Sequence, residues 1–264
     1  MSLCRLGVLF FLALLVGCSA VVVEKDGPGS KRVSAGNIKD AVPKSEPRSK
    51  YGNPKSYEVF GKRYYTLASS KGFVERGVGS WYGKKFHGRK TSSGEIYDMY
   101  QMTAAHKQLP LPTYVEVRNL ENGRSAIVKV NDRGPFHGNR IIDLSYAAAL
   151  KLGYADKGTA MLEVVALDAD GRPNQRPQVA KQSPGGSREV YLQIGAFGER
   201  TNAERLHASV SAYLTEAVRI AIGDDGGRPI YRVQVGPIFS VSVADRVVSA
   251  LSSFGIEEHH FVAN

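Results

Sequence analysis

The sequence predicts two folded domains in series, a small β-barrel followed by an α+β domain with an open antiparallel sheet. A chain of 264 residues is long enough for two small domains. Its middle part holds short apolar segments that often alternate with polar residues, and its last part alternates strand-like and helix-like patterns. A stretch rich in Pro, Gln, Gly and Ser, at about 169–187, separates the two parts and is predicted to be a linker.

Composition and charge narrow the class of protein. Hydrophobic residues make up 42% of the chain, which is typical of a globular protein and argues against wholesale disorder. The formal net charge of +10 favours a polyanionic setting: nucleic acid, anionic lipid or cell-wall polymer. The only two cysteines are Cys4 and Cys18, so the folded domains have no disulfide framework, zinc site or thiol nucleophile.

The first residues have the pattern of an export signal. A single positive charge precedes an apolar run at 6–16, which is shorter than the ~20 residues that span a bilayer. The sequence LVGC at 15–18 resembles a bacterial lipobox, which implies removal of residues 1–17 and lipidation of Cys18. Ser19 then implies sorting to the outer membrane. An ordinary signal peptide that contains a cysteine is the alternative.

Residues 18–50 are predicted to form a lipidated, flexible tether. They hold Gly-Pro-Gly at 27–29 and two further prolines among lysines and serines, with no sustained apolar period. Such a tether would space a lipid anchor from the cell wall.

Residues 51–168 are predicted to form the β-barrel. An Asn-Gly pair at 122–123 predicts a hairpin, and Ser145 and Gly153 predict the N-cap and the end of one helix. The alternating apolar segments predict strands at 79–82, 114–119, 125–130 and 160–167.

Residues 188–264 are predicted to form the second domain, in the order βαββαβ. This order predicts an open four-stranded antiparallel sheet with both helices on one face and the other face free for a ligand. The expected strands are 189–194, 217–222, 231–235 and 258–262, and the expected helices are 202–214 and 243–254.

Three ionisable residues of the first domain are candidates for acid–base chemistry. Glu95 lies in a polar turn, His106 ends a predicted strand, and Asp132 lies where a strand breaks into a turn. Glycosidic cleavage needs a carboxylic acid to protonate the leaving oxygen, and a second group to stabilise positive charge or remove a proton. Each residue also has a structural interpretation: a solvated turn acid, a packed strand histidine, and a turn-forming aspartate.

Five separated motifs of the first domain resemble the rare lipoprotein A family. They are GSWYG at 79–83, FHGRKT at 86–91, TAAH at 103–106, NDRGPF at 131–136 and RIIDLS at 140–145. The resemblance covers about 51–167 and implies a six-stranded double-psi β-barrel. It also implies that Glu95, His106 and Asp132 line one groove as the catalytic constellation.

The resemblance implies cleavage of the β-1,4 bond between N-acetylmuramic acid and N-acetylglucosamine, with the sugar's own C6 hydroxyl as nucleophile. Asp132 is then the general acid/base, Glu95 the second carboxylate, and His106 a hydrogen-bonding or electrostatic partner. Trp81 and Tyr82 are candidates for stacking on sugar rings, with packing in the barrel core as an equally weighted alternative.

The last part of the chain resembles the sporulation-related repeat, or SPOR, domain. The motifs are YLQIGAF at 191–197 and YRVQVGPIF at 231–239. The resemblance implies binding to glycan strands stripped of their stem peptides, which are enriched at the division septum. Gln193, Arg232 and Gln234 offer polar groups and Tyr231 an aromatic face, although strand alternation places Tyr231 with the apolar set.

The predicted function is an endolytic lytic transglycosylase that gives 1,6-anhydro-muramyl ends and is targeted to the septum by its SPOR domain. The alternative is a non-catalytic septal glycan-binding lipoprotein with an expansin-like barrel. The expected location is the outer membrane, facing the periplasm, with denuded glycan strands and division-site proteins as partners. No cofactor, metal or nucleic acid is expected; the adjacent His259 and His260 cannot point to one side of a strand.

Overall fold

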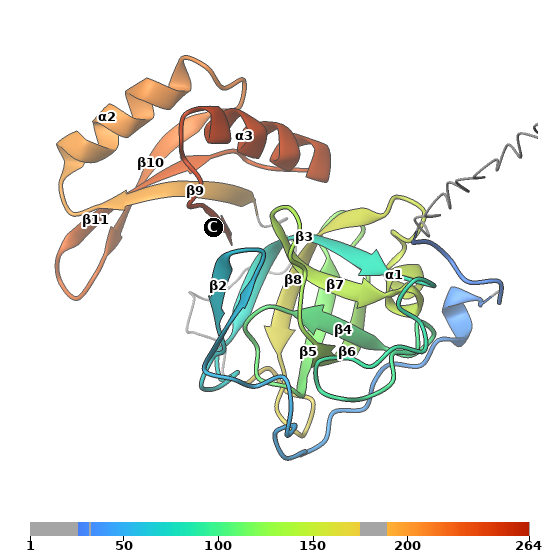
Figure 1. The fold of residues 1–264 in the computed structure, drawn as a ribbon. Coiled ribbons are helices and arrows are strands. Elements are labelled where there is room, and N and C mark those ends of the chain that lie inside the picture. The colour runs from blue at the N-terminus through green and yellow to red at the C-terminus, as the bar shows by residue number, and fades with distance from the viewer. Residues whose placement is uncertain (1–25, 32, 175–188, 264) are drawn as a thin grey trace, which may run out of the picture.

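The computed structural model describes residues 26–31, 33–174 and 189–263. The predicted signal peptide and the lipidation site Cys18 lie outside these ranges. The described residues form a closed barrel and an open sheet covered by two helices (Figure 1). None of the helices in the described ranges is long and apolar enough to cross a membrane.

Six strands close the barrel in the order β3-β7-β4-β6-β5-β8, which confirms the predicted six-stranded barrel. The pairs β3–β7 and β4–β6 are parallel and the other pairs are antiparallel. The strands are β3 (Val74–Tyr82), β4 (Thr103–His106), β5 (Thr113–Asn119), β6 (Ser125–Asp132), β7 (Arg140–Ser145) and β8 (Thr159–Ala166).

Alternating aliphatic side chains fill the barrel. Val115 and Val117 of β5 and Val128 and Val130 of β6 are fully buried, and all four belong to one core cluster. Each buried side chain of this size contributes about 1.5–3 kcal/mol through removal from water. The period-2 pattern that predicted these strands is therefore the pattern that builds the core.

The one helix of the barrel begins and ends where the sequence predicts. In α1 (Tyr146–Leu152), the Ser145 hydroxyl accepts the N–H of Ala148 at 3.2 Å. Gly153 ends the helix with a φ of +75°, a left-handed conformation that favours glycine.

A hairpin that the sequence patterns did not predict precedes the barrel. It pairs β1 (Ser56–Val59) with β2 (Lys62–Tyr65) across a two-residue turn at Phe60 and Gly61, both with positive φ. Such turns favour Asn-Gly or Asp-Gly, so a Phe-Gly turn carries little signal.

Part of the predicted flexible tether is docked on the barrel in the structure. Residues 26–31 and 33–50, called here the N-terminal strap, run along the barrel and include the short 3-10 helix η1 (Ala35–Asn37) (Figure 1). Because β4 pairs only with the last part of β6, the backbone of Ile127 has no strand partner on that side. Its N–H donates to the Asp40 carboxylate at 3.1 Å and its carbonyl accepts the N–H of Ala41 at 3.0 Å. The strap therefore covers a free sheet edge.

Further contacts hold both ends of the strap. Ser49 N–H donates to the Leu111 carbonyl at 2.9 Å. At the other end, the Asp26 carboxylate accepts the N–H groups of Gly83 and Lys85. Most of these contacts are polar, and Ile38 and Ala41 are strap residues that pack against the barrel core, so the strap needs no sustained apolar period.

The barrel also extends beyond its predicted end at residue 168. Asn174 donates its N–H to Ala166 at 2.9 Å and accepts the N–H of Gly72 at 2.6 Å. The first residues of the predicted linker, 169–174, therefore fold back on the barrel.

The C-terminal domain has the predicted βαββαβ order and an antiparallel sheet in the order β10-β11-β9-β12. Its elements are β9 (Val190–Phe197), α2 (Arg200–Ser211), β10 (Val218–Asp224), β11 (Pro229–Val235), α3 (Val241–Ser253) and β12 (His260–Ala263). Both helices lie on one face of the sheet (Figure 1), where Leu192, Val233 and Val235 pack in their core cluster.

The docked strap predicts protection from hydrogen exchange. The amides of Ala41 and Ser49 should exchange at least about tenfold more slowly than the amide of Val42, after correction for intrinsic rates, because they open only when the strap detaches. Val42 is the internal control, since its N–H has no partner within the described residues. Equal protection factors at the three sites, measured by NMR, would show that the strap is free.

Candidate functional site

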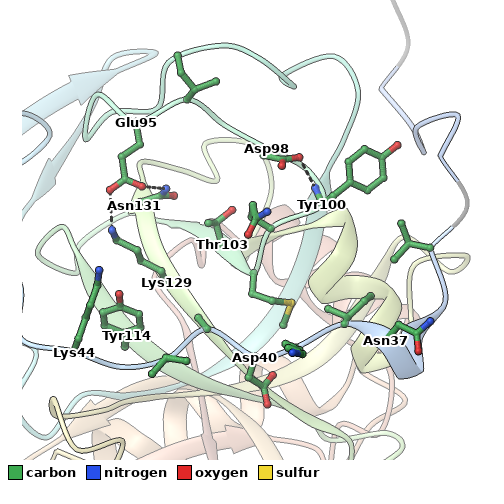
Figure 2. Close-up of a pocket in the computed structure, with 18 of the residues that line it drawn as sticks. Asn37, Asp40, Lys44, Glu95, Asp98, Tyr100, Thr103, Tyr114, Lys129 and Asn131 are labelled. Atoms are coloured by element: carbon green, nitrogen blue, oxygen red, sulfur yellow. Dashed lines mark hydrogen bonds and ion pairs between the residues drawn. The ribbon is translucent and has the colours of Figure 1, made fainter.

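Glu95 lies in the loop between β3 and β4 and points toward β6. A turn holds it: the Thr91 N–H donates to the Glu95 carbonyl at 2.8 Å. The carboxylate binds Lys129 through Oε1 at 2.9 Å and the Asn131 amide through Oε2 at 2.8 Å (Figure 2). Lys129 and Asn131 are two residues apart on β6, so their side chains point to the same side of the strand.

Asp132 ends β6 beside this cluster. Its Oδ1 accepts three hydrogen bonds: the N–H of Ser92 at 2.8 Å, the hydroxyl of Ser92 at 2.7 Å, and the N–H of Arg133 at 2.8 Å. No donor reaches Oδ2 within the described residues. Ser92 precedes Glu95 by three positions, so the structure joins Glu95 and Asp132 at one corner of the barrel.

His106 is not part of this corner. Its side chain is buried, with Nε2 2.9 Å from the Glu75 carboxylate of β3. Nδ1 accepts the N–H groups of Gln108 and Leu109 at 3.1 and 3.0 Å. Because Nδ1 accepts, the proton is assigned to Nε2, which donates to Glu75. Both ring nitrogens are therefore engaged inside the barrel, and the expectation that His106 shares a groove with both carboxylates does not hold for its ring.

Arg133 connects the corner to the neighbouring segments. Its guanidinium donates to the carbonyls of Gly52 at 2.8 Å, Leu109 at 2.6 Å and His106 at 3.1 Å. Burial lowers the pKa of Arg133, but an arginine stays protonated in proteins. His106 is thus linked to the carboxylates through its backbone.

A groove of about 870 Å³ runs from Glu95 along the barrel (Figure 2). One side is formed by Glu95 and by Lys129 and Asn131 of β6, and the other by the strap, with Asp40 and Lys44. The volume lies in the range of ligand pockets, about 300–1,000 Å³. The strap, Lys129 and Asn131 were missed from the sequence, although the alternation of β6 places Lys129 and Asn131 on one side.

The two predicted sugar-stacking aromatics pack in the barrel. Tyr82 is buried and its ring stacks on Tyr97 with centroids 4.0 Å apart. Trp81 is half-buried, packs against the barrel core, and donates its indole N–H to the Ala155 carbonyl at 2.9 Å. Two aromatic residues do line the groove: Tyr114, the strand partner of Lys129, and Tyr100, near the far end (Figure 2).

The helix-free face of the C-terminal sheet carries a polar cluster. Gln193 and Gln234 are directly opposite on β9 and β11, and both are buried. Arg219 of β10 donates two hydrogen bonds to the side-chain oxygen Oε1 of Gln234, at 3.0 and 2.9 Å, and its guanidinium lies 3.4 Å above the ring of Tyr191. Arg232 shares this face by alternation and is half-buried.

Tyr231 lies on the opposite face of that sheet. It packs in the cluster that contains Val233 and the helices. The aromatic residue of the polar face is therefore Tyr191, and Tyr231 is not placed on that face as a sugar contact. Tyr191 and Gln193 are two residues apart in β9, so strand alternation places them on the same face. This alternation was the sequence signal for Tyr191.

Comparison with known proteins matches both domains. Residues 74–164 match the family model described as lytic transglycolase, and residues 186–258 match the SPOR domain. Three similar proteins, from Vibrio cholerae, Pseudomonas aeruginosa and Neisseria meningitidis, are each named endolytic peptidoglycan transglycosylase RlpA. The identities are 45%, 37% and 44%, over 77%, 86% and 76% of this chain and 79%, 81% and 80% of the relatives. The chain therefore belongs to the RlpA family, with a lytic transglycolase domain followed by a SPOR domain.

Proposed function

We propose that this protein is an endolytic lytic transglycosylase that acts on peptidoglycan glycan strands stripped of their stem peptides. The observation that carries the proposal is the corner in which Asp132 is joined through Ser92 to the loop of Glu95, whose side chain lines a groove. The names of the RlpA relatives support the activity.

The proposed reaction needs one proton donor, one proton acceptor and no water. A carboxylic acid gives its proton to the bridging oxygen, and the bond from that oxygen to C1 of N-acetylmuramic acid breaks. The C6 hydroxyl of the same sugar attacks C1 and loses its proton to a carboxylate, which leaves a 1,6-anhydro ring. Because the nucleophile belongs to the substrate, its effective concentration is high and the protein need not hold a water.

The proposed roles follow from the surroundings of each residue. Asp132 acts as general acid/base, since Oδ2 is open while Oδ1 anchors the loop. Glu95 is the second carboxylate, held toward the groove by Lys129 and Asn131. His106 is a positioning residue: its backbone carbonyl accepts a hydrogen bond from Arg133, the residue after Asp132.

Charge supports binding of stripped strands. Amidase cleavage leaves a free carboxylate on each muramic acid in place of the peptide. The groove carries four lysines, Lys31, Lys39, Lys44 and Lys129, and three carboxylates, Asp40, Glu95 and Asp98, in a chain with a net charge of +10.

The remaining parts of the proposal concern location. The SPOR domain would hold stripped strands at the division septum through Arg219, Arg232 and the two glutamines of the polar face. Lipidation of Cys18 would anchor the protein in the outer membrane, with the domains in the periplasm near division-site proteins.

One observation favours the alternative of a non-catalytic glycan-binding lipoprotein. Three donors on Oδ1 of Asp132 are what a purely turn-forming aspartate also shows. The reaction products separate the two functions.

Soluble protein that begins at Ser19 should release anhydro-muramyl products from amidase-stripped peptidoglycan. We expect Asp132→Asn and Glu95→Gln each to lower the rate by about 10²–10⁴-fold, because each removes a group that exchanges or stabilises a proton. Mass spectrometry identifies the products, which are lighter by one water than hydrolytic ones.

The matched control is Asp156→Asn, an exposed carboxylate on the loop after α1, which should keep the wild-type rate. If the wild-type protein releases nothing but still binds stripped sacculi, the alternative function holds. Products with reducing ends would instead show hydrolysis.

The polar face of the SPOR domain predicts a second result. Arg232→Ala should weaken binding to stripped sacculi about tenfold, since a hydrogen bond from a charged donor contributes about 1.5 kcal/mol. Arg205→Ala removes the same charge from α2, on the helical side of the sheet, and should bind as the wild type does. Equal losses in both variants, measured by co-sedimentation, would indicate general charge attraction in place of a binding face.

A further inference from the structure

A carboxylate of the strap reaches the cation that holds Glu95. Glu46 Oε2 lies 3.1 Å from the Lys129 ammonium, which lies 2.9 Å from Glu95 Oε1. The other oxygen of Glu46 accepts the Tyr114 hydroxyl at 2.5 Å. The Glu46 and Lys129 side chains are only 22% and 17% exposed, so solvent screens this pair less than a surface salt bridge.

We propose that Glu46 is a positioning residue of the active site, which acts on Glu95 by sharing Lys129. The inference rests on the proposed function, in which Glu95 takes part in glycan cleavage. Nothing in the family models covers this residue, because the lytic transglycolase match begins at residue 74.

Two carboxylates, Glu46 and Glu95, share the one ammonium of Lys129. A nearby cation favours the ionised form of a carboxyl group, and a nearby anion disfavours it. Glu46 therefore weakens the stabilisation that Lys129 gives to ionised Glu95, in two ways. It holds the ammonium partly on its own side, and it adds a second negative charge.

The protonation states of the network are consistent with this division. Burial alone would lower the pKa of Lys129, but hydrogen bonds to Glu95 and Glu46 outweigh it and raise the pKa. Burial alone would raise the pKa of Glu46, but hydrogen bonds from Tyr114 and Lys129 lower it. Burial and the Glu46 carboxylate raise the pKa of Tyr114, which stays a donor.

Few other titratable groups face the network. Lys44 of the strap lies 3.6 Å from Glu46 and adds a second, more exposed positive charge. Asp132 follows Asn131 on β6 and is engaged by Ser92. Asp98, farther along the loop of Glu95, faces the groove.

The pH–rate profile on amidase-stripped peptidoglycan tests the inference through the sign of two shifts. In Glu46→Gln, Lys129 is left to Glu95 alone, so the limb of the profile that follows the ionisation of Glu95 should move about half a unit to lower pH. In Lys129→Met, two carboxylates remain without their cation, so the same limb should move about one unit to higher pH.

Glu121→Gln is the matched control. The Glu121 side chain is 21% exposed, pairs with Lys157 at 3.1 Å and also accepts the N–H of Met161, so it matches Glu46 in its own exposure and in having a lysine partner, while Lys157 is 68% exposed. It lies in the turn between β5 and β6, away from the groove residues, and its profile should equal that of the wild type.

A Glu46→Gln profile equal to that of Glu121→Gln, or one that moves in the same direction as Lys129→Met, would overturn the inference. If the wild-type protein shows no turnover, the proposed function fails by itself. A ¹³C NMR titration of the Glu95 carboxyl group in the same variants then tests whether Glu46 and Glu95 share Lys129, and it needs no activity. The titration should move to lower pH in Glu46→Gln and to higher pH in Lys129→Met.

Discussion

The hydrogen bonds at the end of β6 are the constraint on which the site depends. Asp132 accepts hydrogen bonds from both the N–H and the hydroxyl of Ser92, and these bonds fix the loop that carries Glu95. The next residue, Arg133, binds carbonyls of Gly52 and Leu109, which belong to two other segments. Buried carbonyls need donors, and a guanidinium supplies five N–H groups in a fixed plane. Two adjacent residues therefore hold three connecting segments against one strand end.

The same barrel topology explains why the N-terminal strap belongs to the site. The parallel pair β4–β6 is short, so part of β6 lacks a neighbour and accepts Asp40 and Ala41 instead. Once docked there, the strap forms a wall of the groove and brings Glu46 to Lys129. A segment that follows a predicted lipidation site thus supplies part of the environment of Glu95. In the proposed sharing of Lys129, docking of the strap and the charge state of the site are coupled.

Sequence patterns predicted the parts of the fold that rest on local rules. The caps of α1, the hairpin at 122–123 and the βαββαβ order were predicted because turn chemistry and apolar period act over a few residues. The docked strap was not, because its partners are distant backbone groups and charges. For the candidate site, family motifs indicated Glu95 and Asp132, but no pattern shows which way a ring such as that of His106 points. The place of Tyr231 followed from strand parity, which outweighed its aromatic character.

Asp132 can both hold the loop of Glu95 and transfer a proton in the proposed reaction, because its two carboxylate oxygens make different interactions. Oδ1 receives three donors and keeps the loop of Glu95 in place, while no donor within the described residues engages Oδ2. In the proposed reaction the proton resides on Oδ2, so Oδ1 keeps its lone pairs and its hydrogen bonds in both protonation states. The geometry of the corner is then retained through the catalytic cycle. A carboxylate that used both oxygens for the loop would have to break a structural bond at each turnover, which is why the open oxygen matters more for function than the number of bonds on the other.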